Sequence, residues 1–183
     1  MLLRLELLAL AALLHGCAPG LSRFENVLAA NDSATVALGQ WCKRQGIADP
    51  PTIRALADRA AQVPASPEIR TALSVGADEA VGYRHVRLAC GDRVLSVAHN
   101  WYVPARLSPE MNRMLETSET PFGKVVSPLG FRRERLSEQR GAMAECPQGT
   151  VLSHRAVLKL SDGRAISLVV ECYTRANISR AKE

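Results

Sequence analysis

The 183-residue sequence contains few aromatic residues, few lysines and no long apolar run. Aromatic residues make up only 4% of the chain, too few for the stacking platforms that bind single-stranded nucleic acid. No stretch of about 18 apolar residues occurs, so a conventional transmembrane helix is not expected. The glycine-rich phosphate-binding loops and the G-x-S-x-G nucleophile motif are also missing. These absences argue against nucleic-acid-binding modules and several common enzyme classes.

The sequence also lacks the spacing of a metal site. No C-x-x-C pair occurs, and the four histidines, His15, His85, His99 and His154, are scattered along the chain. Structural zinc sites normally place Cys and His ligands in closely spaced pairs. We therefore expect neither a metal ion nor another cofactor.

The composition that is present fits one globular domain. Hydrophobic residues make up 47% of the chain and charged residues 22%. Lysine and arginine outnumber aspartate and glutamate by 23 to 18, and only four of the cations are lysines. Because the arginine fork suits carboxylates and phosphates, the excess favours an anionic partner. A base-composition bias of the genome is the alternative explanation.

The first 17 residues have the pattern of a secretory signal peptide. Arg4 precedes the apolar run Leu7–Leu14, and a small residue stands before Cys17. Leu14-His15-Gly16-Cys17 resembles a bacterial lipobox, in which the cysteine is lipidated and becomes the new N-terminus. We expect an exported protein, in the periplasm or anchored to the membrane through Cys17. The alternative is the N-terminal amphipathic helix of a cytoplasmic protein.

The rest of the chain divides into a tether at residues 18–31, a domain at 32–178 and a short tail at 179–183. Four cysteines lie in this domain: Cys42, Cys90, Cys146 and Cys172. In an oxidising compartment this even number predicts one or two disulfides, with three possible connectivities. In a cytoplasmic protein they would be buried free thiols.

The pattern of the domain predicts an α+β fold. A helix is expected over residues 33–45, capped by Ser33 and ended near Gly46, and a second over 109–116. Two hairpins are expected, one formed by residues 80–90 and 93–104 and the other by 151–160 and 165–173. Residues 129–139 predict a long strand, and 52–61 fit a helix or a strand. We therefore predict one antiparallel sheet of about six strands with helices packed on one face.

Three polar residues interrupt the apolar faces of the predicted strands: Arg84, Asn100 and Glu171. Glu171 follows Leu168-Val169-Val170, so its carboxylate is expected to be buried and to need a partner, for which an arginine is the natural choice. One interpretation is a structural Arg–Glu pair, and the other is a ligand pocket with a cation at one end. The mixed charges of residues 131–140 are typical of a solvated strand face.

Four segments, in order and at matching spacing, resemble bacterial chorismate pyruvate-lyase, which splits chorismate into 4-hydroxybenzoate and pyruvate. They are Asp32-Ser33-Ala34-Thr35, the hairpin from Tyr83 to Pro104, Thr120-Pro121-Phe122-Gly123 and Leu168-Val169-Val170-Glu171. The hairpin also resembles the UTRA ligand-sensing domains of bacterial transcription regulators. The resemblance implies the chorismate lyase/UTRA-like fold for the domain.

The resemblance assigns substrate binding to Arg84, Asn100, Phe122, Gly123, Ala34 and Glu171. Arg84 would bind the aromatic carboxylate, Glu171 would accept a hydrogen bond from the ring hydroxyl, and these two would be the catalytic residues. Position 100 holds asparagine where the family has a second arginine.

Three functions follow as hypotheses. The first is elimination of pyruvate from chorismate or a similar enolpyruvyl compound, without a cofactor. The second is a non-catalytic, exported binder of a small aromatic or carboxylate ligand. The third is a structural envelope protein. In each case we expect a monomer that does not bind nucleic acid.

Overall fold

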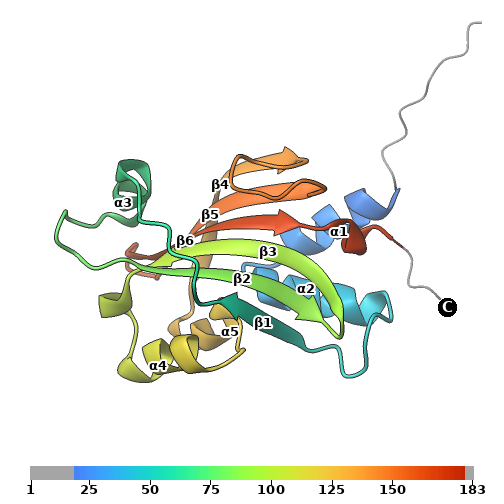
Figure 1. The fold of residues 1–183 in the computed structure, drawn as a ribbon, viewed down its shortest axis with the longest axis horizontal. Helices are drawn as coiled ribbons and strands as arrows, with labels where there is room; N and C mark the ends of the chain where they lie inside the picture. The colour runs from blue at the N-terminus through green and yellow to red at the C-terminus, as the bar shows by residue number, and fades with distance from the viewer. Residues whose placement is uncertain (1–18, 180–183) are drawn as a thin grey trace, which may run out of the picture.

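A six-stranded antiparallel sheet organises the molecule (Figure 1), and the computed structural model describes residues 19–179. The strand order is β1-β2-β3-β6-β5-β4. The strands are β1 Ile53–Asp58, β2 Gly82–Cys90, β3 Arg93–Tyr102, β4 Arg132–Arg140, β5 Leu152–Lys159 and β6 Ala165–Tyr173. Both predicted hairpins, β2–β3 and β5–β6, are confirmed, as is the α+β fold class.

Strand β1 resolves the ambiguity of the segment at residues 52–61. Its six residues pair with β2 from Ile53↔Cys90 to Asp58↔His85. Only Ile53 and Ala55, two residues apart, are fully buried, which is the period of a strand with one face covered. The segment therefore forms an edge strand beside the first hairpin.

Five helices accompany the sheet: α1 Pro19–Ala29, α2 Ala34–Arg44, α3 Pro67–Leu73, α4 Pro109–Thr117 and α5 Phe122–Val125. Helices α1 and α2 pack on the sheet face that carries Val86, Leu88 and Ala98. Leu115 of α4 and Phe122 of α5 pack against Tyr102 on the same face. Most helices therefore cover one face, as predicted. The short helix α3 is the exception, because its Ile69 and Leu73 pack with Trp101 and Val170 on the opposite face.

Helix α2 forms where the sequence predicts it. The Ser33 side chain accepts a hydrogen bond from the amide of Val36, and Gln45 closes the helix. Gly46 follows with φ of +58°, a conformation that favours glycine. The capping residues thus fix where the helix begins, and its first turn forms part of the site described below.

Residues 19–29 differ from the expected tether, because they form helix α1. Phe24 is completely buried, with its ring centroid 5.2 Å from those of both Trp41 and Tyr173. Val27 and Leu28 are buried on the same helix. This burial makes α1 part of the folded domain, whose N-terminal boundary lies before residue 32.

The long connection between β3 and β4 positions the site. It contains the 3₁₀ turns Pro104–Arg106 and Ser127–Leu129 together with α4 and α5. Strand β3 lies in the middle of the sheet and β4 at its edge, so the connection must cross the sheet. It crosses on the face covered by α2, and it thereby places α5 beside the start of α2.

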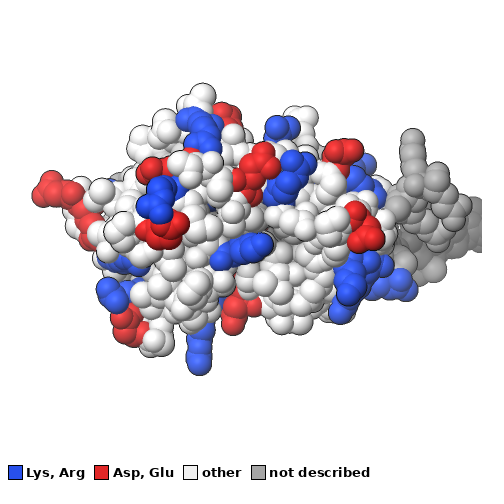
Figure 2. Space-filling view, turned by 90° about the horizontal axis from the view of Figure 1, so that it is seen from below, with Lys and Arg blue, Asp and Glu red and all other residues white. Residues whose placement is uncertain are grey.

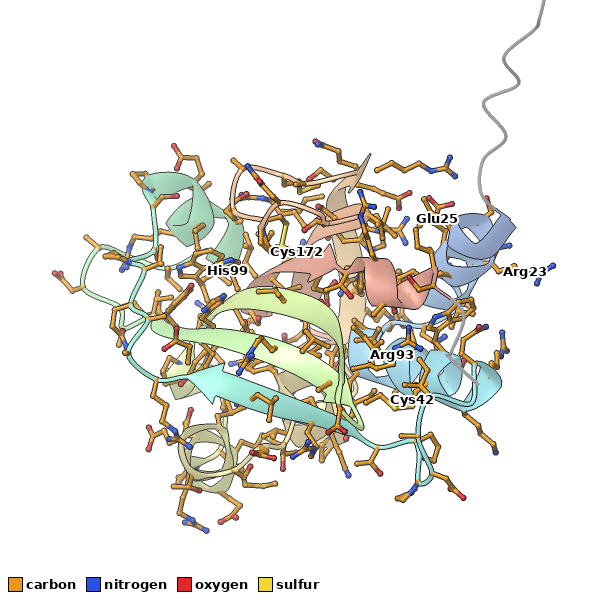
Figure 3. The ribbon with its side chains drawn as sticks, turned by 45° about the vertical axis from the view of Figure 1, so that its right-hand side comes forward. Arg23, Glu25, Cys42, Arg93, His99 and Cys172 are labelled. Carbon is orange, nitrogen blue, oxygen red and sulfur yellow. A yellow bond between two sulfur atoms is a disulfide. The ribbon has the colours of Figure 1, made fainter. Side chains whose placement is uncertain are left out.

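Two disulfides tie loops and helices to the sheet. Cys42 of α2 is bonded to Cys90 at the end of β2, and Cys146 is bonded to Cys172 of β6. The Cα atoms are 6.3 and 5.5 Å apart, respectively. Figure 3 labels Cys42 on α2 and Cys172 on β6, in separate parts of the molecule. The structure thus selects one of the three connectivities.

The predicted signal segment, including Cys17, lies outside the described residues, as does nearly all of the predicted tail. Between residues 19 and 179 no helix has both the length and the apolar character needed to cross a bilayer. The last described turn, Arg175–Asn177, packs against the sheet, where the Asn177 side chain donates hydrogen bonds to the carbonyls of Leu95 and Thr174.

Candidate functional site

A cavity lies between the sheet and the cover formed by α5 and the start of α2. The cavity itself is small, about 50 Å³, and it lies within a depression of about 500 Å³ that is partly open to solvent. All six residues that the sequence singles out for substrate binding line it: Ala34, Arg84, Asn100, Phe122, Gly123 and Glu171. Val86, Leu88, Ala98, Phe131, Leu158 and Val169 give the wall its apolar character. The structure thus brings together residues that are up to 137 positions apart.

Arg84 of β2 supplies positive charge at one end of the cavity. Only 8% of the residue is exposed, and its Nε and Nη2 atoms are buried without a hydrogen-bond partner. Burial lowers the pKa of this arginine from its usual value, while the neighbouring Tyr102 opposes the shift. A buried cation without a partner costs free energy. Arg84 is therefore suited to receive an anion.

Asn100 lies beside Arg84, because the two residues are register partners on β2 and β3. Its Oδ1 accepts a hydrogen bond from the hydroxyl of Ser167, which is fully buried on β6. Its Nδ2 is buried and has no partner. This end of the cavity therefore presents N–H donors from two side chains.

Glu171 stands at the other end of the cavity, on β6. Its register positions place its Cα roughly 12 Å from that of Arg84, two strands across and two residues along the sheet. Arg133 of β4 forms a two-point ion pair with it, Nη1 lying 3.3 Å from Oε1 and Nη2 bonding Oε2. The hydroxyl of Tyr173 donates to Oε2 over 3.0 Å. The negative charge of Glu171 is thus already balanced by Arg133 within the protein.

The partner of Glu171 is an arginine, as the sequence predicts, and the structure identifies it as Arg133. Although burial opposes its charge, Glu171 and Tyr173 raise the pKa of Arg133 above the usual value. Only 8% of this side chain is exposed, whereas nearly all of β4 is exposed. The prediction of a solvated face over residues 131–140 is therefore correct in general and wrong at Arg133.

The sequence carried a weak signal for Arg133. Phe131 stands two positions before it, so both side chains fall on one face of an extended strand. Both residues line the cavity. Five further charged residues in the same segment hide this alternation.

The cover over the cavity is closely packed at Gly123. A Cβ atom at this position would lie 2.8 Å from Oγ of Ser33 and 3.1 Å from Oγ1 of Thr35. Any larger residue would push the Ser33 or Thr35 side chain aside, so glycine lets α5 pack closely on the first turn of α2. Ala34, between those two residues, reaches the same cavity wall.

His154 is buried behind Glu171 and is its register partner on β5. Its ring stands edge-on to Tyr173, with centroids 5.3 Å apart, and Nε2 lies 3.2 Å from Oε2 of Glu138. Burial lowers the pKa of His154 to about 4, against the opposing effect of Glu171. This histidine is therefore neutral at pH 7.

His99 takes no part in the cavity, as the strand periodicity predicts. It lies on the opposite face of the sheet, where its Nδ1 is 2.7 Å from the hydroxyl of Tyr83 and its Nε2 is 3.0 Å from the carbonyl of Glu145. It therefore links β3 to the loop that contains Cys146.

The face in Figure 2 shows no patch of a single charge, and the described side chains form no cluster that could bind a metal. Acidic and basic groups are interspersed over the face shown in Figure 2. Within residues 19–179 no three His, Cys, Asp or Glu side chains gather in a way that could hold a metal ion. The arrangement suits recognition of a small anion by Arg84 and Asn100 against an apolar wall.

Comparison with solved structures places the fold. The effector domain of PhnF from Mycobacterium smegmatis superposes with a TM-score of 0.54 at 16% identity, covering 78% of this chain and 88% of that domain. PhnF itself gives 0.56 at 15% identity over 80% of this chain and 65% of its own length. A protein assigned as the ligand-binding domain of a GntR-family transcriptional regulator from Bordetella bronchiseptica gives 0.51 at 17% identity, covering 66% and 85%. The fold is therefore that of UTRA effector domains, as predicted.

Sequence comparison identifies a family member. No family model matches the chain. The uncharacterized protein y4mC of Sinorhizobium fredii (strain NBRC 101917 / NGR234) is 44% identical over 166 residues, covering 80% of this chain and 70% of that protein. The chain therefore belongs to the same protein family as y4mC, with a domain of the chorismate lyase/UTRA-like fold.

Proposed function

We propose that this protein is a non-catalytic binder of a small aromatic carboxylate, which it holds in the cavity between the sheet and α5. The observation that carries the proposal is Arg84, a buried cation in the cavity wall whose Nε and Nη2 atoms have no partner. These two nitrogens form one edge of the guanidinium, and this edge can donate two parallel hydrogen bonds to a carboxylate. A bound carboxylate would neutralise the charge and satisfy both donors.

The remaining wall suits an aromatic ring. Phe122, Phe131 and Val169 line the cavity together with other apolar side chains. A planar ring between such side chains is recognised mainly by apolar burial, while a few polar groups fix its orientation. The carboxylate of Glu171 is an acceptor at the far end, and its pairing with Arg133 leaves it able to accept a ligand hydroxyl.

Elimination of pyruvate from chorismate receives less support from this cavity. Chorismate carries two carboxylates, and Arg84 is the one cavity-lining cation without a partner in the described part of the chain. Asn100 contributes a donor but no charge. We therefore propose ligand binding, and not elimination of pyruvate, as the function of this cavity.

We also propose that the protein works outside the cytoplasm, anchored through a lipid on Cys17. The two disulfides support this proposal, because such bonds persist mainly in oxidising compartments.

Binding is tested by calorimetric titration of the folded protein with 4-hydroxybenzoate. We expect saturable 1:1 binding that is lost in Arg84→Met and retained in the matched variant Arg87→Met, whose side chain is exposed on the same strand. Absence of binding by the wild type, or unchanged binding by Arg84→Met, would overturn the proposal.

Catalysis is tested separately with chorismate as the substrate and release of 4-hydroxybenzoate as the readout. We expect no product above the uncatalysed background. Turnover that depends on Arg84 would instead restore the lyase function.

A further inference from the structure

We propose that Ser167 is a positioning residue of this site: it holds the Asn100 amide with its N–H donors towards the ligand, so that the site selects a carboxylate over a carboxamide. This inference rests on the proposed function and names the feature that sets its specificity. The juxtaposition that carries it consists of Arg84, Asn100 and Ser167 on three consecutive strands, β2, β3 and β6.

The hydrogen bond from Ser167 determines which end of the amide faces the cavity. Strands β2 and β6 flank β3 on opposite sides, so Ser167 and Arg84 approach Asn100 from opposite sides. The Ser167 hydroxyl donates to Oδ1 and draws the amide oxygen towards β6. The Nδ2 group is therefore left on the side of Arg84 and has no partner there.

This orientation creates an end of the cavity that only donates hydrogen bonds. Its unpartnered atoms are Nε and Nη2 of Arg84 and Nδ2 of Asn100, all buried. A carboxylate has only acceptors and can satisfy all three. A carboxamide of the same shape would direct one of its own N–H groups at these donors, leaving buried polar groups without partners.

The opposite amide orientation would remove this preference. With Oδ1 turned towards β2, it could accept a hydrogen bond from Arg84 and occupy the edge that would otherwise hold the ligand. A serine hydroxyl can donate as well as accept, and in this structure it donates. Without that hydroxyl, Oδ1 has no partner on β6, while its register partner Arg84 on β2 offers unpartnered donors.

The experiment compares the dissociation constants of 4-hydroxybenzoate and 4-hydroxybenzamide for the wild type and Ser167→Ala. Hydrogen bonds to charged groups correspond to at least about tenfold in affinity. We expect the wild type to prefer the carboxylate by that factor or more. Ser167→Ala should lose about tenfold of this preference, mainly by binding the carboxylate more weakly. The matched control is Ser96→Ala, which removes another fully buried serine hydroxyl of the sheet that does not line the cavity.

Two more measurements separate positioning from general loss of structure. Ser167→Thr retains the hydroxyl and should therefore keep the wild-type preference for the carboxylate over the carboxamide. In the wild type, the side-chain amide resonances of Asn100, assigned by their loss in Asn100→Asp, should shift when the carboxylate binds.

The outcomes distinguish this inference from the proposed function. If the wild type binds the carboxylate but Ser167→Ala keeps its full preference, or if the Asn100 resonances do not move, only the role of Ser167 is overturned. If the wild type binds neither compound, the proposed function and this inference fall together.

Discussion

Arg133 and Glu171 form a buried two-point ion pair at one end of the cavity, with only 8% and 7% of their side chains exposed. The pair joins the edge strand β4 to β6, two strands away, across the intervening β5. It also explains how a carboxylate is tolerated in a strand that is buried along its whole length. At the opposite end Arg84 has no such partner, so the unsatisfied charge of the cavity is positive.

The first prediction concerns the cost of breaking this pair. Arg133→Met leaves Glu171 buried without a cation, which should lower the free energy of unfolding by about 3–5 kcal/mol. The double variant Arg133→Met with Glu171→Gln should recover much of that loss, because no uncompensated charge remains. Urea denaturation measures both effects. The neighbouring Arg132 is exposed, so Arg132→Met should change stability by less than about 0.5 kcal/mol. Equal losses at positions 132 and 133 would contradict the prediction.

The second prediction concerns the stability of the empty site. Arg84→Met removes a buried cation whose Nε and Nη2 make no hydrogen bond, so the free energy of unfolding should stay unchanged or rise by about 1 kcal/mol. A functional residue is thus expected to be replaceable without loss of stability. Thermal unfolding in ligand-free buffer measures this effect. A large decrease in melting temperature would show that Arg84 is a structural residue.

The third prediction concerns acid sensitivity. His154 has a pKa of about 4 in the folded protein, lowered mainly by burial from its usual 6.5. Because the unfolded chain binds a proton at higher pH than the folded chain, this histidine favours unfolding increasingly as the pH falls from 6.5 towards 4. The loss amounts to about 3 kcal/mol across that window, and stability should be independent of this residue above pH 7. His154→Gln should therefore show a smaller decrease in unfolding free energy between pH 7 and pH 4.5.

The control for this measurement is His85→Gln, since His85 lies on the opposite face and its side chain is 26% exposed. A decrease as small as that of His154→Gln in this variant would mean that the effect does not come from the buried histidine beside Glu171. If His154→Gln keeps the pH dependence of the wild type, the folded protein protonates His154 normally.

The fourth prediction concerns the disulfides. The bonds Cys42–Cys90 and Cys146–Cys172 span 48 and 26 residues, respectively. Restricting loops of these lengths in the unfolded chain corresponds to about 4 and about 3.5 kcal/mol. Paired Cys→Ala variants should lose up to these amounts in denaturation experiments without reductant, and dithiothreitol should destabilise the wild type but not a variant that lacks all four cysteines. Insensitivity of the wild type to reductant would contradict the prediction.

The fifth prediction concerns export. If Cys17 is lipidated, metabolic labelling with a fatty acid should mark the wild-type protein expressed in a Gram-negative host, and Cys17→Ser should abolish the label. Cys42→Ser serves as the control because Cys42 lies in the folded domain. An unlabelled wild-type protein would end the proposal of a lipid anchor.

The elements that local sequence determines agree closely with the structure. The β2–β3 and β5–β6 hairpins follow from alternating apolar residues on either side of glycine-containing turns, and α2 follows from its Ser33 cap and the glycine after it. Local sequence does not predict helix α1, because its apolar stripe is short. The helix is held in place by the packing of Phe24 against Trp41 and Tyr173. Its stability comes from tertiary packing rather than from a local signal.

Strand alternation and turn chemistry are local properties, and they were enough to predict the antiparallel sheet, its two hairpins and the candidates Arg84, Asn100 and Glu171. The pairing of the four cysteines and the identity of the arginine that neutralises Glu171 depend on contacts between distant segments. The choice of arginine depends on the crossing of residues 104–131 over the sheet, which places β4 at the edge and brings Arg133 over β6. No local pattern specifies such a crossing. Once Arg133 satisfies Glu171, the unpaired charge in the cavity is that of Arg84, and this decides where an anionic ligand can bind.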